Sequence, residues 1–249
     1  MLRLYKAYMA RFLQNVFFLG GCVIALVVTF AVTSNRIVFP FLEDLDPSRR
    51  MFFVTAAMVA FFTIFVPVFS NMEYTDGVIR NKMIPGFSQK QIFFSQYLSY
   101  VSLALIMWLC YLIGGIAGGA NPFGEYLTAN LVFLVALMSF ISVVLMLSFR
   151  VTKTVVIIII AGMMFSASFN MVLFGNLILM IASDSGNAVA ELIAALIYNV
   201  NTLGQWFALS GFADDYANPG TPLQILLSLM VILLMTVLGT LGLKKRDLV

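Results

Sequence analysis

The charged residues that could take part in chemistry or binding lie outside six long apolar runs. The densest group is TDGVIRNKMIPGFSQKQIF, residues 75–93, in which Arg80, Lys82 and Lys90 surround a Pro85–Gly86 break. Histidine, the commonest acid–base group and metal ligand, is absent. There is no G-x-x-x-x-G-K-[ST] phosphate loop, and the apolar runs hold no paired carboxylates. We therefore expect no catalysis and no metal site in this chain, but a polar segment that can dock another protein.

The composition predicts a membrane protein. Of the 249 residues 62% are hydrophobic and 10% charged, and the mean hydropathy is +1.02, whereas soluble domains are roughly 45–50% apolar and about 25% charged. A helix needs about 20 apolar residues to cross the bilayer. Six runs qualify: about 15–33, 51–72, 92–119, 127–149, 154–182 and 223–243. Since none shows the period-two alternation of a barrel strand, we expect an all-α integral membrane protein with one transmembrane domain, 1–249.

The distribution of charge predicts the orientation. If the N-terminus is cytoplasmic, six spans place eleven of the 14 cations but only three of the 11 acidic residues on the cytoplasmic side. Both termini are then cytoplasmic. The net charge of +3 gives no indication of nucleic-acid binding.

Short helices are expected beside the spans. MLRLYKAYMARFLQN, residues 1–15, has a basic amphipathic pattern and is either an interfacial helix or an extension of the first span. Between spans two and three, Asp76 can cap a short amphipathic helix that runs to Met83 and ends before Pro85–Gly86. Ser88 and Gln91 form a capping box for the third span.

The longest outer connection, residues 183–221, contains apolar residues at helical spacing but no run of spanning length. It is consistent with short re-entrant or interfacial helices before the sixth span, or with an outer loop helix. Within the third span, Gly114 with Gly118 and Gly115 with Gly119 have the spacing that allows close helix approach, although this glycine-rich stretch also suits the end of the span.

The segment YTDGVIRNKMIPGFSQKQIFFSQY resembles the cytoplasmic segment between spans two and three of bacterial ABC-2 type permeases. The pattern D-G-[TV]-I-R-N-K-x-I-x-G-[HYF]-S-[RQ]-x-x-I-[FY] is matched over about 20 residues, with Gln89 where a basic residue is common. Elsewhere the likeness is one of architecture. The resemblance implies the transmembrane subunit of an ABC exporter in the bacterial cell membrane, a homodimer or heterodimer working with two separate ATPase subunits that bind ATP and Mg²⁺.

The same resemblance implies roles for particular residues. The coupling helix, which sits in a groove of the ATPase, would comprise Asp76, Gly77, Val78, Ile79, Arg80, Asn81, Lys82, Met83, Gly86, Ser88 and Lys90. Spans two and five would face the transport path, with Phe61, Phe65, Phe165, Phe169 and Asn170 in contact with a hydrophobic or amphipathic substrate such as a peptide, a drug or a lipid. Helix packing is an alternative role for these five residues.

Other classes of function stay open at this point. A passive channel or membrane sensor would need no ATPase. An ion-coupled transporter usually keeps ionisable residues within its spans, and none of the six predicted spans has one, although a sodium site made of carbonyl and hydroxyl oxygens would need none.

Overall fold

The computed structural model describes residues 1–37, 42, 44–75, 78–84, 86–123, 126–151, 153–200 and 221–241. Every regular element in these ranges is a helix. The helices are α1 (Leu2–Leu13), α2 (Val16–Thr33), α3 (Pro47–Arg50), α4 (Phe52–Thr75), α5 (Val78–Met83), α6 (Gln89–Gly118), α7 (Leu127–Arg150), α8 (Thr154–Asp184), α9 (Ala188–Val200) and α11 (Thr221–Thr240).

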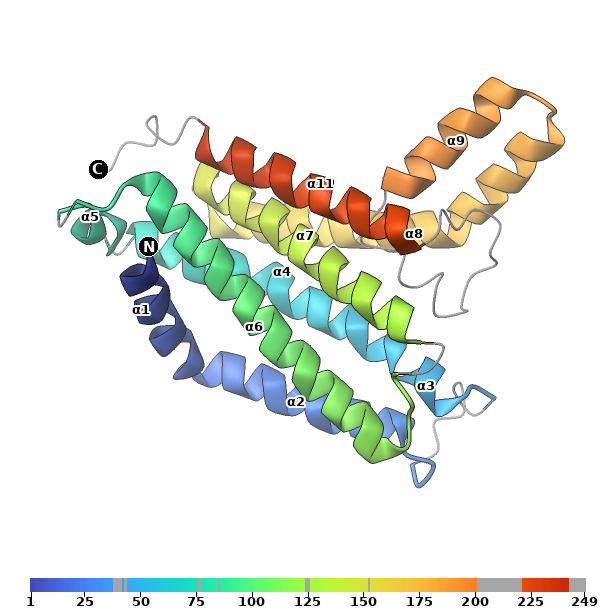
Figure 1. Ribbon diagram of the computed structural model, residues 1–249, viewed down its shortest axis with the longest axis horizontal. Coiled ribbons are helices and arrows are strands. Elements are labelled where there is room, and N and C mark those ends of the chain that lie inside the picture. The colour runs from blue at the N-terminus through green and yellow to red at the C-terminus, as the bar shows by residue number, and fades with distance from the viewer. Residues whose placement is uncertain are drawn as a thin grey trace.

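The long helices form a bundle with two distinct ends (Figure 1). Helix α2 packs against α6, α11 packs along α7, and α4 contacts both α7 and α8. The short helices α1 and α5 lie at one end of the bundle, which we call the α1–α5 end, and α3 lies at the other. Helix α9 folds back on the last part of α8, so the two form a hairpin that projects beyond the bundle.

Five helices in the described part of the chain are long and apolar enough to cross a membrane: Val16–Thr33, Pro47–Glu73, Gln89–Gly118, Leu127–Arg150 and Thr221–Thr240. They correspond to five of the six predicted spans, and the chain is a multi-pass helical membrane protein. The other predicted span, 154–182, falls on the 31-residue helix α8, whose described apolar part is Thr154–Ser168.

The second span extends beyond its predicted end at residue 72. Helix α4 continues to Thr75 and therefore includes Glu73, whose exposed fraction is 1%. The predicted run 51–72 holds no charged residue, but the helix that contains it carries a buried carboxylate directly after the run. The predicted run ends before Glu73 because Glu73 is the first charged residue after the apolar stretch. The helix continues through Glu73 because neighbouring side chains neutralise its charge.

The N-terminal helix is separate from the first span rather than an extension of it. Asn15 adopts an extended backbone, and its Oδ1 accepts hydrogen bonds from the backbone N–H groups of Phe17 and Phe18, so it caps the start of α2. The buried face of α1 consists of Leu4, Tyr8 and Phe12, and it packs mainly against α6.

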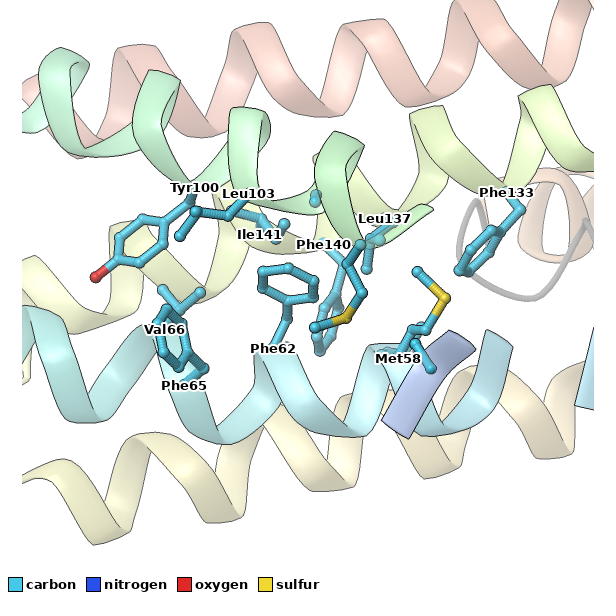
Figure 2. Packing of buried hydrophobic residues seen from close by; sticks show 14 of the residues in the cluster. Met58, Phe62, Phe65, Val66, Tyr100, Leu103, Phe133, Leu137, Phe140 and Ile141 are labelled. Carbon is cyan, nitrogen blue, oxygen red and sulfur yellow. The ribbon is translucent and has the colours of Figure 1, made fainter. Parts of the chain in front are cut away.

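The core lies where α4, α6 and α7 meet. Figure 2 shows Phe62 of α4 pointing toward Leu103 of α6 and toward Phe140 and Ile141 of α7, and all four are buried. The same view shows Tyr100 of α6 beside Phe65 of α4. The two rings are edge-to-face with centroids 6.2 Å apart.

Glycines allow α2 and α6 to approach closely. A Cβ atom at Gly114 would collide with the backbone carbonyl of Leu26, and one at Gly118 with Thr33. The prediction of close helix approach at this pair is confirmed. At the second predicted pair, a Cβ atom at Gly115 would lie 3.1 Å from the end of the Met51 side chain, and one at Gly119 would have no atom of the described residues within 4 Å, so Gly119 takes no part in a close helix approach. Gly119 instead ends α6 with a left-handed φ of 103°.

Two further local predictions are confirmed. Ser88 and Gln91 form both hydrogen bonds of the capping box at the start of α6. A helix, α9, occupies residues 188–200 of the long connection, while residues 201–220 lie outside the described residues.

Candidate functional site

Glu73 is the centre of a polar cluster at the α1–α5 end. Its Oε1 accepts hydrogen bonds from Arg11 Nη1 at 2.8 Å and from Lys82 Nζ at 2.9 Å. Its Oε2 accepts from the Tyr8 hydroxyl at 2.8 Å, from Lys82 Nζ at 2.9 Å and from Gln96 Nε2 at 2.6 Å. We call these five residues the Glu73 cluster.

The cluster explains how a carboxylate can be buried in an otherwise apolar bundle. An isolated charge is very costly to remove from water, and the cost falls only when charged partners and hydrogen bonds compensate it. Glu73 has two cationic partners and two neutral donors, so both of its oxygens are satisfied. The partners keep some access to solvent, since the Arg11 side chain is 40% exposed and the Lys82 side chain 19% exposed.

Tyr8 contacts both members of the Lys82–Glu73 ion pair. Its ring centroid lies 3.8 Å from Lys82 Nζ, a cation–π contact, while its hydroxyl donates to Glu73. Burial, with a further contribution from the Glu73 charge, raises the pKa of the Tyr8 hydroxyl above its ordinary value. Burial also lowers the pKa of Lys82 below 10.5, although Glu73 acts in the opposite direction.

The Glu73 cluster joins four helices. Tyr8 and Arg11 belong to α1, Glu73 to α4, Lys82 to α5 and Gln96 to α6. Helix α5 is therefore held in place by side-chain contacts with α4 and α1, in addition to its chain connections to α4 and α6. It ends at Met83, whose carbonyl accepts from the N–H of Gly86, and Gly86 has a φ of 91° that allows the turn toward α6.

The sequence-predicted coupling residues have different surroundings. Asn81, Gly86, Ser88 and Lys90 are exposed. Lys82 instead points into the Glu73 cluster, and Met83 is partly buried against the core. Asp76 and Gly77 lie outside the described residues, as do the side chains of Val78, Ile79 and Arg80. The exposed surface next to α5 also includes Ile84, which is 78% exposed.

The predicted path residues of α4 line a groove, which we call the α4 groove. It has a volume of about 530 Å³ and is lined by Asn15, Phe17, Phe61, Ile64, Phe65, Val68, Phe69 and Met72. A second cavity of about 250 Å³ lies between α2, α4 and α6, and Phe61 and Ile64 line both. The two cavities therefore follow one continuous side of α4.

Of the predicted path residues of α8, Phe165 and Asn170 are not among the residues that line these two cavities. Phe165 is partly buried against the core, and the side chain of Phe169 lies outside the described residues. Asn170 is exposed, and its Nδ2 donates to the backbone carbonyl of Ser166 one turn earlier. Among the described contacts, its polar group is thus used within its own helix.

Sequence reasoning missed Glu73, Tyr8, Arg11 and Gln96 as parts of one site. One signal was available: Glu73 lies four residues after Phe69 and eight after Phe65, at the spacing of one helix face. An acidic residue that continues an apolar face predicts a buried carboxylate. Which cations approach it depends on the packing of α1 and α5, for which the pattern along α4 gives no information.

Comparison of the chain with protein-family models, with curated proteins and with solved structures finds no match.

Proposed function

We propose that this chain is the permease subunit of an ATP-driven exporter of the ABC-2 type, with α5 as the helix that couples it to separate cytoplasmic ATPase subunits. The observation that carries the proposal is the Lys82–Glu73 ion pair, which holds α5 against the ends of α1, α4 and α6. The segment that resembles the coupling region of such permeases is thus the segment that is fastened to the bundle.

The geometry suits the transmission of force. A helix attached only through flexible loops would move without moving the spans, whereas α5 is short, is tied to the end of α4 by a bidentate contact, and is followed by the capped start of α6. Force applied to α5 therefore reaches α4 and α6 together. The exposed Asn81 and Ile84 leave a surface for an ATPase.

In this proposal the chain works as a dimer in the bacterial cell membrane, with its termini and α5 on the cytoplasmic side. The substrate is hydrophobic or amphipathic, because the α4 groove near Phe61 and Phe65 has apolar walls. ATP and Mg²⁺ belong to the ATPase subunits, and this chain contributes no catalytic group.

Affinity capture of the tagged chain from its native membranes tests the proposal. We expect to recover an ATPase with a Walker A sequence, and we expect Arg80→Glu combined with Ile84→Asp to reduce its recovery. Lys153→Glu is the matched control, because Lys153 is an exposed cation outside α5 on the same predicted side. Equal recovery with both variants would contradict a coupling role for α5.

Reconstitution into vesicles separates the classes of function. An exporter of this type moves substrate only when the ATPase and nucleotide are added. Solute flux through the chain alone and independent of ATP would indicate a channel, and flux that follows an imposed ion gradient would indicate an ion-coupled transporter. Either result would overturn the proposal.

A further inference from the structure

We propose that the α4 groove binds one acyl chain of an anionic phospholipid from the leaflet that faces the α1–α5 end. This inference goes beyond the transport function and needs no ATPase. The inference depends only on the membrane location of the bundle. In the orientation proposed above, the leaflet that faces the α1–α5 end is the cytoplasmic leaflet.

The shape and lining of the groove fit an acyl chain. Its volume of about 530 Å³ lies within the range of ligand sites, roughly 300–1,000 Å³. Among the described lining residues Asn15 is the one polar residue, and the others are apolar. Ile64, which is 54% exposed, lies on its open side rather than in the core.

The length of the groove fits one leaflet. Its lining residues on α4 extend from Phe61 to Met72, a rise of about 16 Å at about 1.5 Å per residue. The hydrocarbon core of a bilayer is about 30 Å thick, so a single leaflet contributes about 15 Å. The groove thus extends from near the middle of the membrane to the end of the bundle that carries α1.

The charge at the α1 end of the groove favours an anionic headgroup. Arg11 precedes the lining residue Asn15 by four positions, and its partner Glu73 directly follows the lining residue Met72 in α4, so the Arg11–Glu73 pair lies near the Met72 end of the groove. The Glu73 cluster contains two cations and one anion, and Arg3 and Lys6 are further exposed cations nearer the N-terminus of α1. Arginine presents a planar set of donors that matches phosphate oxygens, and Arg11 uses Nη1 for Glu73 while its side chain stays 40% exposed.

Native mass spectrometry of the full chain tests the proposal. The protein is delipidated in detergent, and phosphatidylglycerol or phosphatidylcholine is added in equal amounts. We expect the wild type to retain phosphatidylglycerol preferentially. Ile64→Trp, which fills the groove from its open side, should lower retention of both lipids about tenfold. Leu98→Trp is the matched control, since Leu98 is 52% exposed on α6 and lines neither cavity.

The headgroup contact is tested separately. Arg11→Gln should reduce the preference for phosphatidylglycerol about fivefold, and Arg11→Lys should keep most of it because the positive charge is retained. Melting temperatures of all variants show whether the fold is intact. Equal retention of the two lipids by the wild type, or unchanged retention by Ile64→Trp, would overturn the proposal. So would a loss of dimer mass without a loss of lipid in Ile64→Trp, which would assign the groove to a second copy of the chain.

Discussion

The ammonium nitrogen of Lys82 in α5 lies 3.8 Å from the ring centroid of Tyr8 in α1. The two residues are 74 positions apart in the sequence, and both also bind Glu73 of α4. An ammonium between a ring face and a carboxylate is attracted by both groups, so the position of α5 is determined by α1 as well as by α4. This arrangement connects the first helix of the chain to the segment proposed to receive force from an ATPase.

Removal of the Glu73 charge should loosen α5. Glu73→Gln should destabilise the protein by about 2 kcal/mol, less than the roughly 3–5 kcal/mol for breaking a fully buried pair, because Arg11 and Lys82 can turn toward water. The melting temperature in detergent should fall by about 4–8 °C. Trypsin should cleave faster after Lys82, while cleavage after the exposed Lys90 should keep its rate and serves as the internal control. An unchanged rate after Lys82 would show that the cluster does not hold α5.

Substitutions of Tyr8 should separate its two contacts. Tyr8→Phe keeps the ring below the ammonium and removes the hydroxyl that donates to Glu73, so it should cost about 1 kcal/mol. Tyr8→Leu removes both contacts and leaves space in the buried face of α1, and it should cost about 3 kcal/mol. Chemical denaturation in mixed micelles measures both values. Equal costs for the two variants would mean that the ring contributes nothing to the site.

Lys82 should lose its proton at a lower pH than an unperturbed lysine. Burial lowers its pKa below 10.5, Glu73 raises it and Arg11 lowers it. Glu73→Gln should therefore lower the pKa of Lys82 further, whereas Arg11→Gln should raise it. The ¹³C shifts of reductively methylated lysines followed against pH, with Lys82→Arg used for assignment, measure these changes. If the pKa of Lys82 changed in the same direction in both variants, the result would contradict the geometry of the cluster.

The sign of the effect on stability follows from the lowered pKa of Lys82. Between that pKa and 10.5 the unfolded chain holds a proton that the native chain has released, so raising the pH through this window increases the free energy of unfolding. The wild type should therefore gain stability relative to Lys82→Met as the pH approaches 10.5. If the wild type instead lost stability relative to Lys82→Met over this pH range, the native state would hold the proton of Lys82 more tightly than the unfolded chain does.

Gly114 and Gly115 should respond differently to alanine. A Cβ at Gly114 meets the backbone of Leu26, which can move only if α2 shifts away from α6, so Gly114→Ala should cost about 1–3 kcal/mol. A Cβ at Gly115 meets the flexible end of Met51 at 3.1 Å, so Gly115→Ala should stay within about 0.5 kcal/mol. Melting temperatures of the two variants provide the comparison. A cost at Gly115 as large as at Gly114 would mean that the backbone contact is not what limits this site.

The helices and the membrane class follow from the amino-acid sequence alone. Continuous apolar runs must form helices in lipid because backbone groups have no other partners there, and local signals such as the Ser88–Gln91 capping box and the Gly119 end act within a few residues of the helix termini. Predicted and observed boundaries of the described spans therefore agree within a few residues, and Gly114 with Gly118 indicated a close approach that α2 supplies.

Which charged residues come into contact depends on how the helices pack. The amphipathic pattern of residues 78–83 places Lys82 on the polar side, which favours an exposed side chain, yet Lys82 is turned inward because Glu73 and Tyr8 lie beside it. The site draws on residues 8, 11, 73, 82 and 96, and helical periodicity relates only residues a few positions apart. An ion pair between distant segments depends on how the helices that carry them pack, and so does the groove beside α4.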